Sequence, residues 1–240
     1  MNWLSGRVVE NRHWTESLFS LRVEDAPLGF QAGQFVRIAL DVEGQRVARA
    51  FSFVNPPQDP VLEFYGVVVP QGPLSPRLAR LAHGDRLYVA SNPAGFLVLP
   101  ELPDARTLWL LSTGTGLAPF LSILRTPEPY RRFRNIVLVH AVRHAKELVY
   151  RELIGKLNVR YVSFVSREAH EGSLAGRIPA AIADGRLEAA AGLTISAATS
   201  QAMLCGNPEM LRDASAALQA RGLRKHRRRA PGHITVESFW

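Results

Sequence analysis

The sequence predicts two domains: an antiparallel six-stranded β-barrel, followed by a doubly wound α/β domain with a parallel sheet. Three observations lead to this fold class. The first hundred residues hold short β-rich runs, the remainder alternates strands with helices, and a proline-flanked segment at 99–104 separates the two patterns. Alternation of strand and helix is typical of parallel sheets. We therefore expect the first domain to span residues 1–100 and the second to span residues 101–240.

In the first hundred residues, β-branched and aromatic runs are separated by Gly, Pro, Asp and Asn, which is typical of a barrel or a sandwich. One helix is expected at 74–85, where Ser75 can cap it, Pro76 suits its first turn and Gly84 can end it. The expected strands are 6–10, 17–24, 34–42, 48–55, 62–69 and 85–92.

After residue 100, apolar runs with strand character alternate with segments of helical spacing, as in a doubly wound sheet. The expected strands are 108–112, 136–140, 160–165, 202–205 and 233–237. The expected helices are 117–124, 146–157, 178–183 and 209–220. In such a sheet, ligands bind in the crevice outside the carboxyl ends of the strands.

Composition narrows the class of protein further. The 240 residues are 47% hydrophobic, which suits a sizeable core. We find no apolar run long enough for a membrane span, and the first residues lack the apolar centre of a signal peptide. The only cysteine is Cys205, so an internal disulfide and a four-cysteine iron–sulfur site are excluded. We expect a cytoplasmic protein with no membrane partner and no metal.

The net charge of +8 predicts an anionic partner: a nucleic acid, a phosphate-bearing cofactor or an acidic protein. Part of the excess lies in "RKHRRR" at 224–229, a run that also suits a solvated face. Because no separate basic domain and no interleaved aromatic residues accompany this run, we expect no nucleic-acid partner.

The stretch "STGTGLAP" at 112–119 joins a predicted strand to a predicted helix. Its glycines let the backbone approach a phosphate, Thr113 and Thr115 add hydroxyl donors, and the helix start offers free N–H groups. Pro119 falls in the first helical turn, where a missing N–H costs little. The alternative is a tight turn that needs glycine for structural reasons alone.

Three further stretches carry chemistry. In "RAFSF" at 49–53, an arginine and two aromatic residues share one strand face, so the arginine can pair with a phosphate beside a flat ring. "LCGNPEML" at 204–211 ends a buried strand at Cys205 and starts a helix. "PGHITVESFW" ends on two aromatic residues that either pack in the core or cover a ligand. Taken singly, an amphipathic strand and a core cysteine are the alternatives.

Together these stretches resemble the ferredoxin/flavodoxin–NADP(+) reductases of the compact bacterial type. "RAFSF" resembles the family's R-x-Y-S flavin motif, and "GPLSPRLARL" its flavin-phosphate segment. "STGTGLAPFLSIL" is similar to its nicotinamide-nucleotide motif, "LCGNPEML" to its C-G-N-P motif, and "PGHITVESFW" to its aromatic C-terminus. The resemblance runs from end to end, in the family's order. It implies that the barrel binds FAD and that the second domain binds NADP(H).

The resemblance also implies roles for the flavin site. Arg49 would bind the FAD pyrophosphate, Phe51 would stack on the flavin ring, and Ser52 would hydrogen-bond N5, the atom that accepts hydride. Phe51 stands where the family has tyrosine, so one hydroxyl contact is lost. The other expected FAD contacts are Ala50, Phe53, Tyr65, Val67, Val68, Leu74, Ser75, Thr115 and Trp240, the last against the adenine end. For Val67 and Val68, core packing is the alternative.

For the nucleotide, Arg143, Arg167 and Arg177 match positions that read the adenosine end and its 2′-phosphate. Glu168 would favour NAD, but several arginines outweigh it. The other expected NADP contacts are Thr113, Gly114, Gly116, Asn207 and Pro208. Cys205 and Glu237 resemble the pair beside the nicotinamide and the flavin, and with Ser52 they form the expected catalytic group.

The implied activity is electron transfer between NADPH and ferredoxin or flavodoxin, with hydride passing between nicotinamide and FAD N5. Arg227, Arg228 and Arg229 are candidates for docking that acidic protein, and general solubility is the alternative for each. We expect a monomer. The alternative functions are an NAD(P)H-dependent flavin reductase and the reductase component of an oxygenase.

Overall fold

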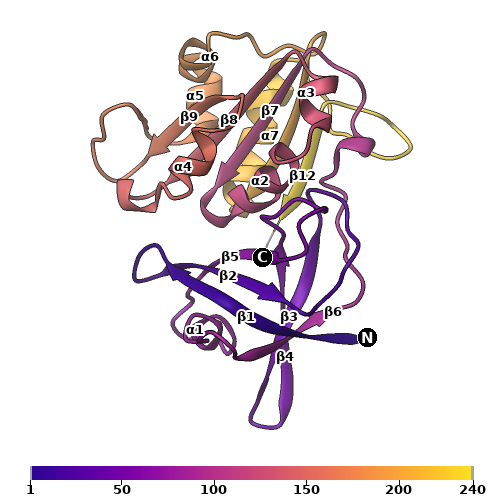
Figure 1. The fold of residues 1–240 in the computed structure, drawn as a ribbon. Helices are drawn as coiled ribbons and strands as arrows, with labels where there is room; N and C mark the ends of the chain where they lie inside the picture. Colours follow the sequence, from indigo (N-terminus) through magenta and orange to yellow (C-terminus); the bar gives the residue numbers. More distant parts are fainter. Residues whose placement is uncertain (1, 239–240) are drawn as a thin grey trace.

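Two six-stranded sheets organise the chain, one below the other in Figure 1. The computed structural model describes residues 2–238. The first sheet is antiparallel and the second is parallel, so the predicted fold class is confirmed. The predicted boundary at residues 100 and 101 stays a prediction; it lies in the connection 91–106 between the sheets.

The first sheet has the strand order β4-β3-β6-β1-β2-β5. An isolated bridge between Phe53 and Phe64 brings its edges together, so the sheet curls into a partly closed barrel. Its core includes Phe19, Phe53 and Phe64, which are fully buried. The strands are β1 (Trp3–His13), β2 (Leu18–Glu24), β3 (Phe35–Val42), β4 (Gln45–Ser52), β5 (Leu62–Val67) and β6 (Arg86–Ala90).

The helix expected at 74–85 is much shorter, since α1 covers only Ser75–Leu78. The side-chain amide of Asn11 donates to the carbonyl oxygens of Leu78, Ala79 and Leu81 at 3.2, 3.0 and 2.8 Å. Carbonyls that would continue the helix therefore have a partner on β1. Ser75 was also wrongly expected to cap this helix, because its hydroxyl accepts the N–H of Val69 instead.

The second sheet has the order β10-β9-β8-β7-β11-β12. The chain moves outward from β7 in one direction and then returns to the other side at β11, so the topological switch point lies between these two strands. Ligands bind at this point in doubly wound sheets. The strands are β7 (Thr107–Thr113), β8 (Asn135–Val142), β9 (Arg160–Val165), β10 (Leu174–Ala175), β11 (Ser200–Gly206) and β12 (Ile234–Ser238).

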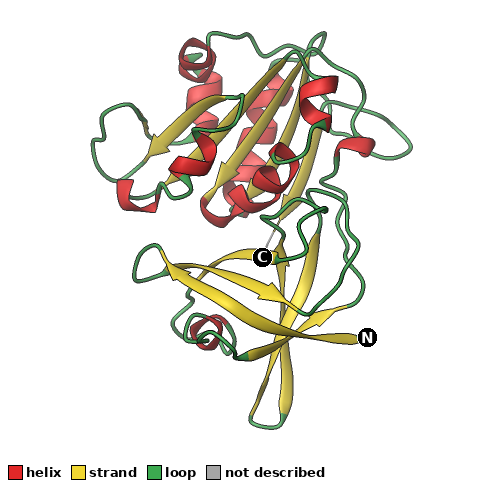
Figure 2. Ribbon diagram, in the orientation of Figure 1, coloured by secondary structure: helices red, strands yellow, loops and turns green. Residues whose placement is uncertain are grey.

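Helices cover both faces of the second sheet (Figure 2). On β7, Leu108 and Leu110 pack toward α2, while Trp109 and Leu111 pack toward α5 and α7. The elements near the first face are α2 (Ala118–Leu124), α3 (Glu128–Arg132) and α4 (Arg151–Ile154), and those on the second are α5 (Ile178–Ala183), α6 (Arg186–Ala191) and α7 (Pro208–Ala220). Short turns of 3-10 helix are η1 (Leu99–Glu101), η2 (Gly114–Leu117) and η3 (Ala145–Glu147).

The helix expected at 146–157 is interrupted. It is replaced by η3 and the four-residue α4, and Tyr150 between them has a left-handed backbone with φ of 60°. The Tyr150 side chain reaches the first domain, which explains the break. Within residues 2–238, no helix is long and apolar enough to cross a membrane.

Candidate functional site

A cleft of about 380 Å³ lies at the carboxyl edge of the second sheet and is lined by both domains. Tyr65 and Val67 of β5 contribute one wall, and the turn after β7 contributes Thr113, Gly114 and Thr115. The cleft continues past Asn207 to the three arginines expected at the adenosine end, Arg143, Arg167 and Arg177. The structure therefore gathers predicted flavin residues and predicted nucleotide residues into one cavity.

The floor of the cleft depends on close backbone packing at the switch point. A Cβ atom on Gly116 would collide with the carbonyl oxygen of Cys205, and one on Gly206 would collide with the hydroxyl of Thr113. The backbone N–H of Asn207 donates to that hydroxyl at 2.8 Å. Glycine is thus needed structurally at 116, so this residue packs the turn onto β11 rather than facing the cleft.

Asn207 also caps α7, since its side-chain oxygen accepts the N–H groups of Glu209 and Met210 at 2.8 and 3.3 Å. Pro208 is the first residue of the helix, one position before the expected start at 209. Capping fixes where the helix begins beside the cleft.

The three arginines lie on loops after different elements of the sheet, and all are exposed. Within residues 2–238, none of the three forms an ion pair with a carboxylate. Their charges therefore remain available for a phosphate, which guanidinium groups bind through parallel N–H donors.

Glu168, the acidic residue weighed against NADP, does not line the cleft. One of its carboxylate oxygens accepts the N–H of Ala145 at 2.6 Å, and the other lies 3.4 Å from His144 Nδ1. These contacts, the first above all, hold the pKa of Glu168 below its ordinary value. Its carboxylate thus stabilises the loop after Arg143.

Three residues of the expected flavin site carry buried polar atoms that lack partners. Among the described residues, the Ser52 hydroxyl, the Tyr65 hydroxyl and one carboxylate oxygen of Glu237 make no hydrogen bond. Buried polar groups in native proteins are nearly always satisfied, so three orphans near one junction fit a polar cofactor such as the flavin. Burial raises the pKa of Tyr65 above its usual range, and it raises that of Glu237 to about 7 against an opposing hydrogen bond from Phe96.

Cys205 is completely buried at the end of β11, opposite Ser112 on β7 and Glu237 on β12. Burial raises the pKa of its thiol well above the usual value, and the neighbouring Glu237 adds to this effect. The thiol is therefore protonated at neutral pH and is a poor nucleophile.

Among the other expected flavin residues, Arg49 and Ala50 are exposed and Phe51 is half-buried near Gly66. The Phe53 ring stacks on Phe30 in the barrel core, with ring centres 3.8 Å apart, so only its backbone is left for a cofactor. Leu74 likewise buries its side chain, and the Ser75 hydroxyl is engaged with Val69. Val68 is half-buried, and its N–H bonds to the carbonyl of Ser17. The expected adenine contact, Trp240, lies outside the described residues.

Sequence reasoning missed the acidic residues that line the cleft, namely Glu147, Glu209 and Asp213. Glu209 and Asp213 are four residues apart on α7, directly after the predicted C-G-N-P segment, so their helical spacing was the available signal. Glu147 accepts the N–H groups of Arg143 and His144, which no local pattern indicates.

Comparisons with known proteins agree with this geometry. The family profile described as "Oxidoreductase FAD-binding domain" matches residues 7–97, and "Oxidoreductase NAD-binding domain" matches 110–216. The flavodoxin/ferredoxin–NADP reductase of Escherichia coli K12 is 50% identical over 246 aligned positions, covering 100% of this chain and 99% of the relative. The ferredoxin–NADP reductase of Pseudomonas aeruginosa is 38% identical over an alignment that covers 98% of this chain and 97% of the relative.

A solved structure is similar over its whole length. It is a ferredoxin NADP+ reductase from Neisseria gonorrhoeae with bound FAD and NADP, 32% identical, with a TM-score of 0.96 and complete coverage of both chains. The chain therefore belongs, as its sequence predicted, to the flavodoxin/ferredoxin–NADP reductases, a family of oxidoreductases that use FAD and NADP(H).

Proposed function

We propose that this reductase transfers electrons between NADPH and a ferredoxin or flavodoxin, with the nicotinamide end of the nucleotide beside Tyr65. The observation that carries the proposal is the shared cleft, because it runs from three unpaired arginines on the second domain to β5 of the first. A nucleotide bound with its phosphate at the arginines would extend toward the barrel. Its reactive end would then lie where both domains meet.

On the flavin side, Ser52, Glu237 and Cys205 are the proposed catalytic group. FAD, when bound, supplies the conversion between two-electron hydride chemistry and one-electron transfer. The unpartnered Ser52 hydroxyl is free to donate to a flavin nitrogen. Glu237 can hold a proton near pH 7 in this half-buried position, and Cys205 supports the nicotinamide through packing. Phe51 and Arg49 are proposed to hold the ring and the pyrophosphate.

On the nucleotide side, Arg143, Arg167 and Arg177 are proposed to select the 2′-phosphate. Because the Glu168 carboxylate accepts the N–H of Ala145, it is directed away from the position proposed for the 2′-phosphate. The turn at Thr113 and Gly114 and the start of α7 at Asn207 are proposed to hold the pyrophosphate.

For the protein acceptor, we propose a basic surface around the 224–229 loop. Arg228 lies over the exposed ring of Phe96, 3.9 Å from its centre, and pairs with Glu101 at 3.1 Å. Phe96 is also in contact with Glu237 through its backbone, so this surface adjoins the flavin side of the molecule. Positive charge around an exposed redox edge steers an acidic electron-transfer protein.

A monomer in the cytoplasm, with domains 1–100 and 101–240, completes the proposal. Full-length similarity to named reductases supports this activity over a free-flavin reductase or an oxygenase component. The test is steady-state reduction of a panel of ferredoxins and flavodoxins by NADPH and by NADH. Rapid reduction of free flavin with no turnover of any protein acceptor would favour the flavin-reductase alternative.

A further inference from the structure

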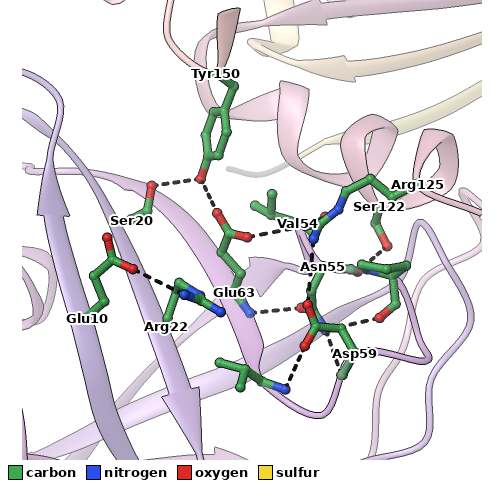
Figure 3. Close-up of polar contacts among 12 residues, drawn as sticks. Glu10, Ser20, Arg22, Val54, Asn55, Asp59, Glu63, Ser122, Arg125 and Tyr150 are labelled. Carbon is green, nitrogen blue, oxygen red and sulfur yellow. Dashed lines mark hydrogen bonds and ion pairs between the residues drawn. The ribbon is translucent and has the colours of Figure 1, made fainter. Parts of the chain in front are cut away.

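A polar network joins the two domains (Figure 3). The Tyr150 hydroxyl donates to Glu63 Oε1 at 2.9 Å and lies 2.7 Å from the hydroxyl of Ser20. Arg125, at the end of α2, donates to Glu63 Oε2 at 3.3 Å. Glu63 and Ser20 belong to the first domain, and Tyr150 and Arg125 belong to the second. We call these four residues the interdomain network.

The direction of each hydrogen bond follows from the number of protons. A tyrosine hydroxyl has one proton, and here Glu63 accepts it. Ser20 must then donate to Tyr150, while the indole N–H of Trp14 donates to Ser20 at 2.5 Å. Ser20 and Tyr150 are both buried. Loss of one hydrogen bond in this chain would therefore leave a polar atom unsatisfied and out of reach of water.

The same contact surface links the two cofactor-bearing segments. Ser122 and Arg125 of α2 donate to the backbone carbonyls of Asn55 and Val54 at 2.7 and 3.2 Å. Val54 and Asn55 directly follow the "RAFSF" strand, and α2 directly follows the "STGTG" turn. A displacement of α2 would therefore move the nucleotide turn relative to the flavin strand.

Tyr150 connects this surface to the loop that begins at Arg143. Its left-handed backbone is a strained conformation for a residue with a side chain, and such strain persists only where the surroundings hold it. The Tyr150 ring packs between Trp14 and Tyr65, with ring centres 4.8 and 5.4 Å away. Tyr65 in turn lines the nucleotide cleft.

We propose that Tyr150 and Glu63 are positioning residues for hydride transfer, which fix the nucleotide turn at the reacting distance from the flavin strand. The inference rests on the proposed function, because it takes the cofactors to lie at those two segments. Reaction rates respond strongly to small errors in the distance between reacting atoms. None of the four residues of the interdomain network lines the cleft, so the proposed effect acts through the relative position of the two domains.

The test compares Tyr150→Phe with Tyr130→Phe in the FAD-bound protein. Tyr150→Phe removes one hydroxyl and keeps the ring between Trp14 and Tyr65. Tyr130 is the matched control, because its hydroxyl donates to Leu124 within the second domain, at 2.8 Å. Stopped-flow flavin reduction by NADPH gives the limiting rate and the dissociation constant separately. We expect the limiting rate of Tyr150→Phe to fall about tenfold, with the dissociation constant nearly unchanged, and Tyr130→Phe to match the wild type.

A readout independent of turnover comes from calorimetry. Loss of the interdomain network should split a single unfolding transition into two in Tyr150→Phe and in Glu63→Gln, which removes the charge and keeps the size. An unchanged limiting rate in both variants would overturn the proposal, even if both lose stability, since the role would then be structural. A higher dissociation constant for NADPH in these variants, with an unchanged limiting rate, would also overturn the proposal. A wild type that NADPH fails to reduce would instead refute the proposed function.

Discussion

Asn207 and Thr113 are joined by a hydrogen bond of 2.8 Å from the Asn207 backbone to the Thr113 hydroxyl, across the switch point of the parallel sheet. The two residues follow β11 and end β7, and they are 94 positions apart in the chain. The bond therefore sets the spacing between two loops that are expected to hold the same pyrophosphate. Removal of this hydrogen bond should weaken the binding of any nicotinamide nucleotide, with or without a 2′-phosphate.

Thr113→Val is the corresponding change. It keeps the shape of the side chain but leaves the Asn207 N–H without its partner, at a cost of about 0.5–1.5 kcal/mol. We expect the dissociation constants of NADPH and NADH to rise together, by about two- to tenfold. Binding titrations that follow the flavin spectrum measure both. Thr113→Ser keeps the acceptor and serves as the control; equal weakening by both variants would exclude the hydrogen bond as the cause.

Arg167→Ala should weaken the use of NADPH but not that of NADH. Charge-assisted hydrogen bonds are each worth about 1.5–3 kcal/mol, so the KM for NADPH should rise about ten- to hundredfold. The KM for NADH should stay nearly the same, because NADH has no 2′-phosphate. Arg186 is the control, since it pairs with Asp184 and lies outside the cleft. An equal loss with both nucleotides would refute the assignment of Arg167.

Cys205→Ser tests packing beside the nicotinamide. The buried thiol has a raised pKa, so iodoacetamide should not label the folded wild type at neutral pH. The serine variant should retain FAD and bleach more slowly with NADPH in stopped flow, because misplacement of about 1 Å costs up to about 10²-fold. Unchanged bleaching would make Cys205 a residue of the sheet core only, and loss of flavin with the fold would make its role structural.

Glu237→Gln should change how stability depends on pH. Burial raises the pKa of this carboxyl from 4.5 to about 7. Below about pH 4.5 the group is protonated in both folded and unfolded chains, so its full contribution is present. As pH rises to about 7, the unfolded chain ionises first and up to about 3 kcal/mol of stability is lost.

Urea unfolding of the FAD-bound protein between pH 4.5 and 8 measures this effect. The wild type should lose stability across the window, and Glu237→Gln should lose less. Glu152 is exposed, so Glu152→Gln should follow the wild-type curve and is the matched control. Identical pH curves for wild type and Glu237→Gln would show that the carboxyl ionises normally.

The cleft was predictable because its residues follow strands. Parallel strands place their carboxyl ends at one edge of a sheet, so Thr113, Arg143, Arg167 and Asn207 meet whatever the intervening sequence does. Local motifs predicted Thr113 and Asn207 at this edge, and the two arginines were predicted from their match to the family's positions. The resemblance to the reductase family then joined the barrel residues to the same site.

The errors arose where a distant side chain overrides local helical preference. Asn11 takes the carbonyls that would extend α1, and Glu63 and Ser20 hold Tyr150 in a conformation that breaks a helical pattern. The partners are separated by more than 65 positions in each case. Periodicity is read from neighbouring residues, so it has no access to such contacts.

The single crossing of the chain from one sheet to the other, at 91–106, has a consequence for how such proteins diversify. Each half is continuous in the gene, so recombination can exchange a complete half without cutting through a sheet. What such an exchange must preserve is the fit of Glu63 to its two partners from the other half, Arg125 and Tyr150. A chimaera whose new half lacks these donors would leave the half-buried carboxylate of Glu63 without its Arg125 and Tyr150 partners.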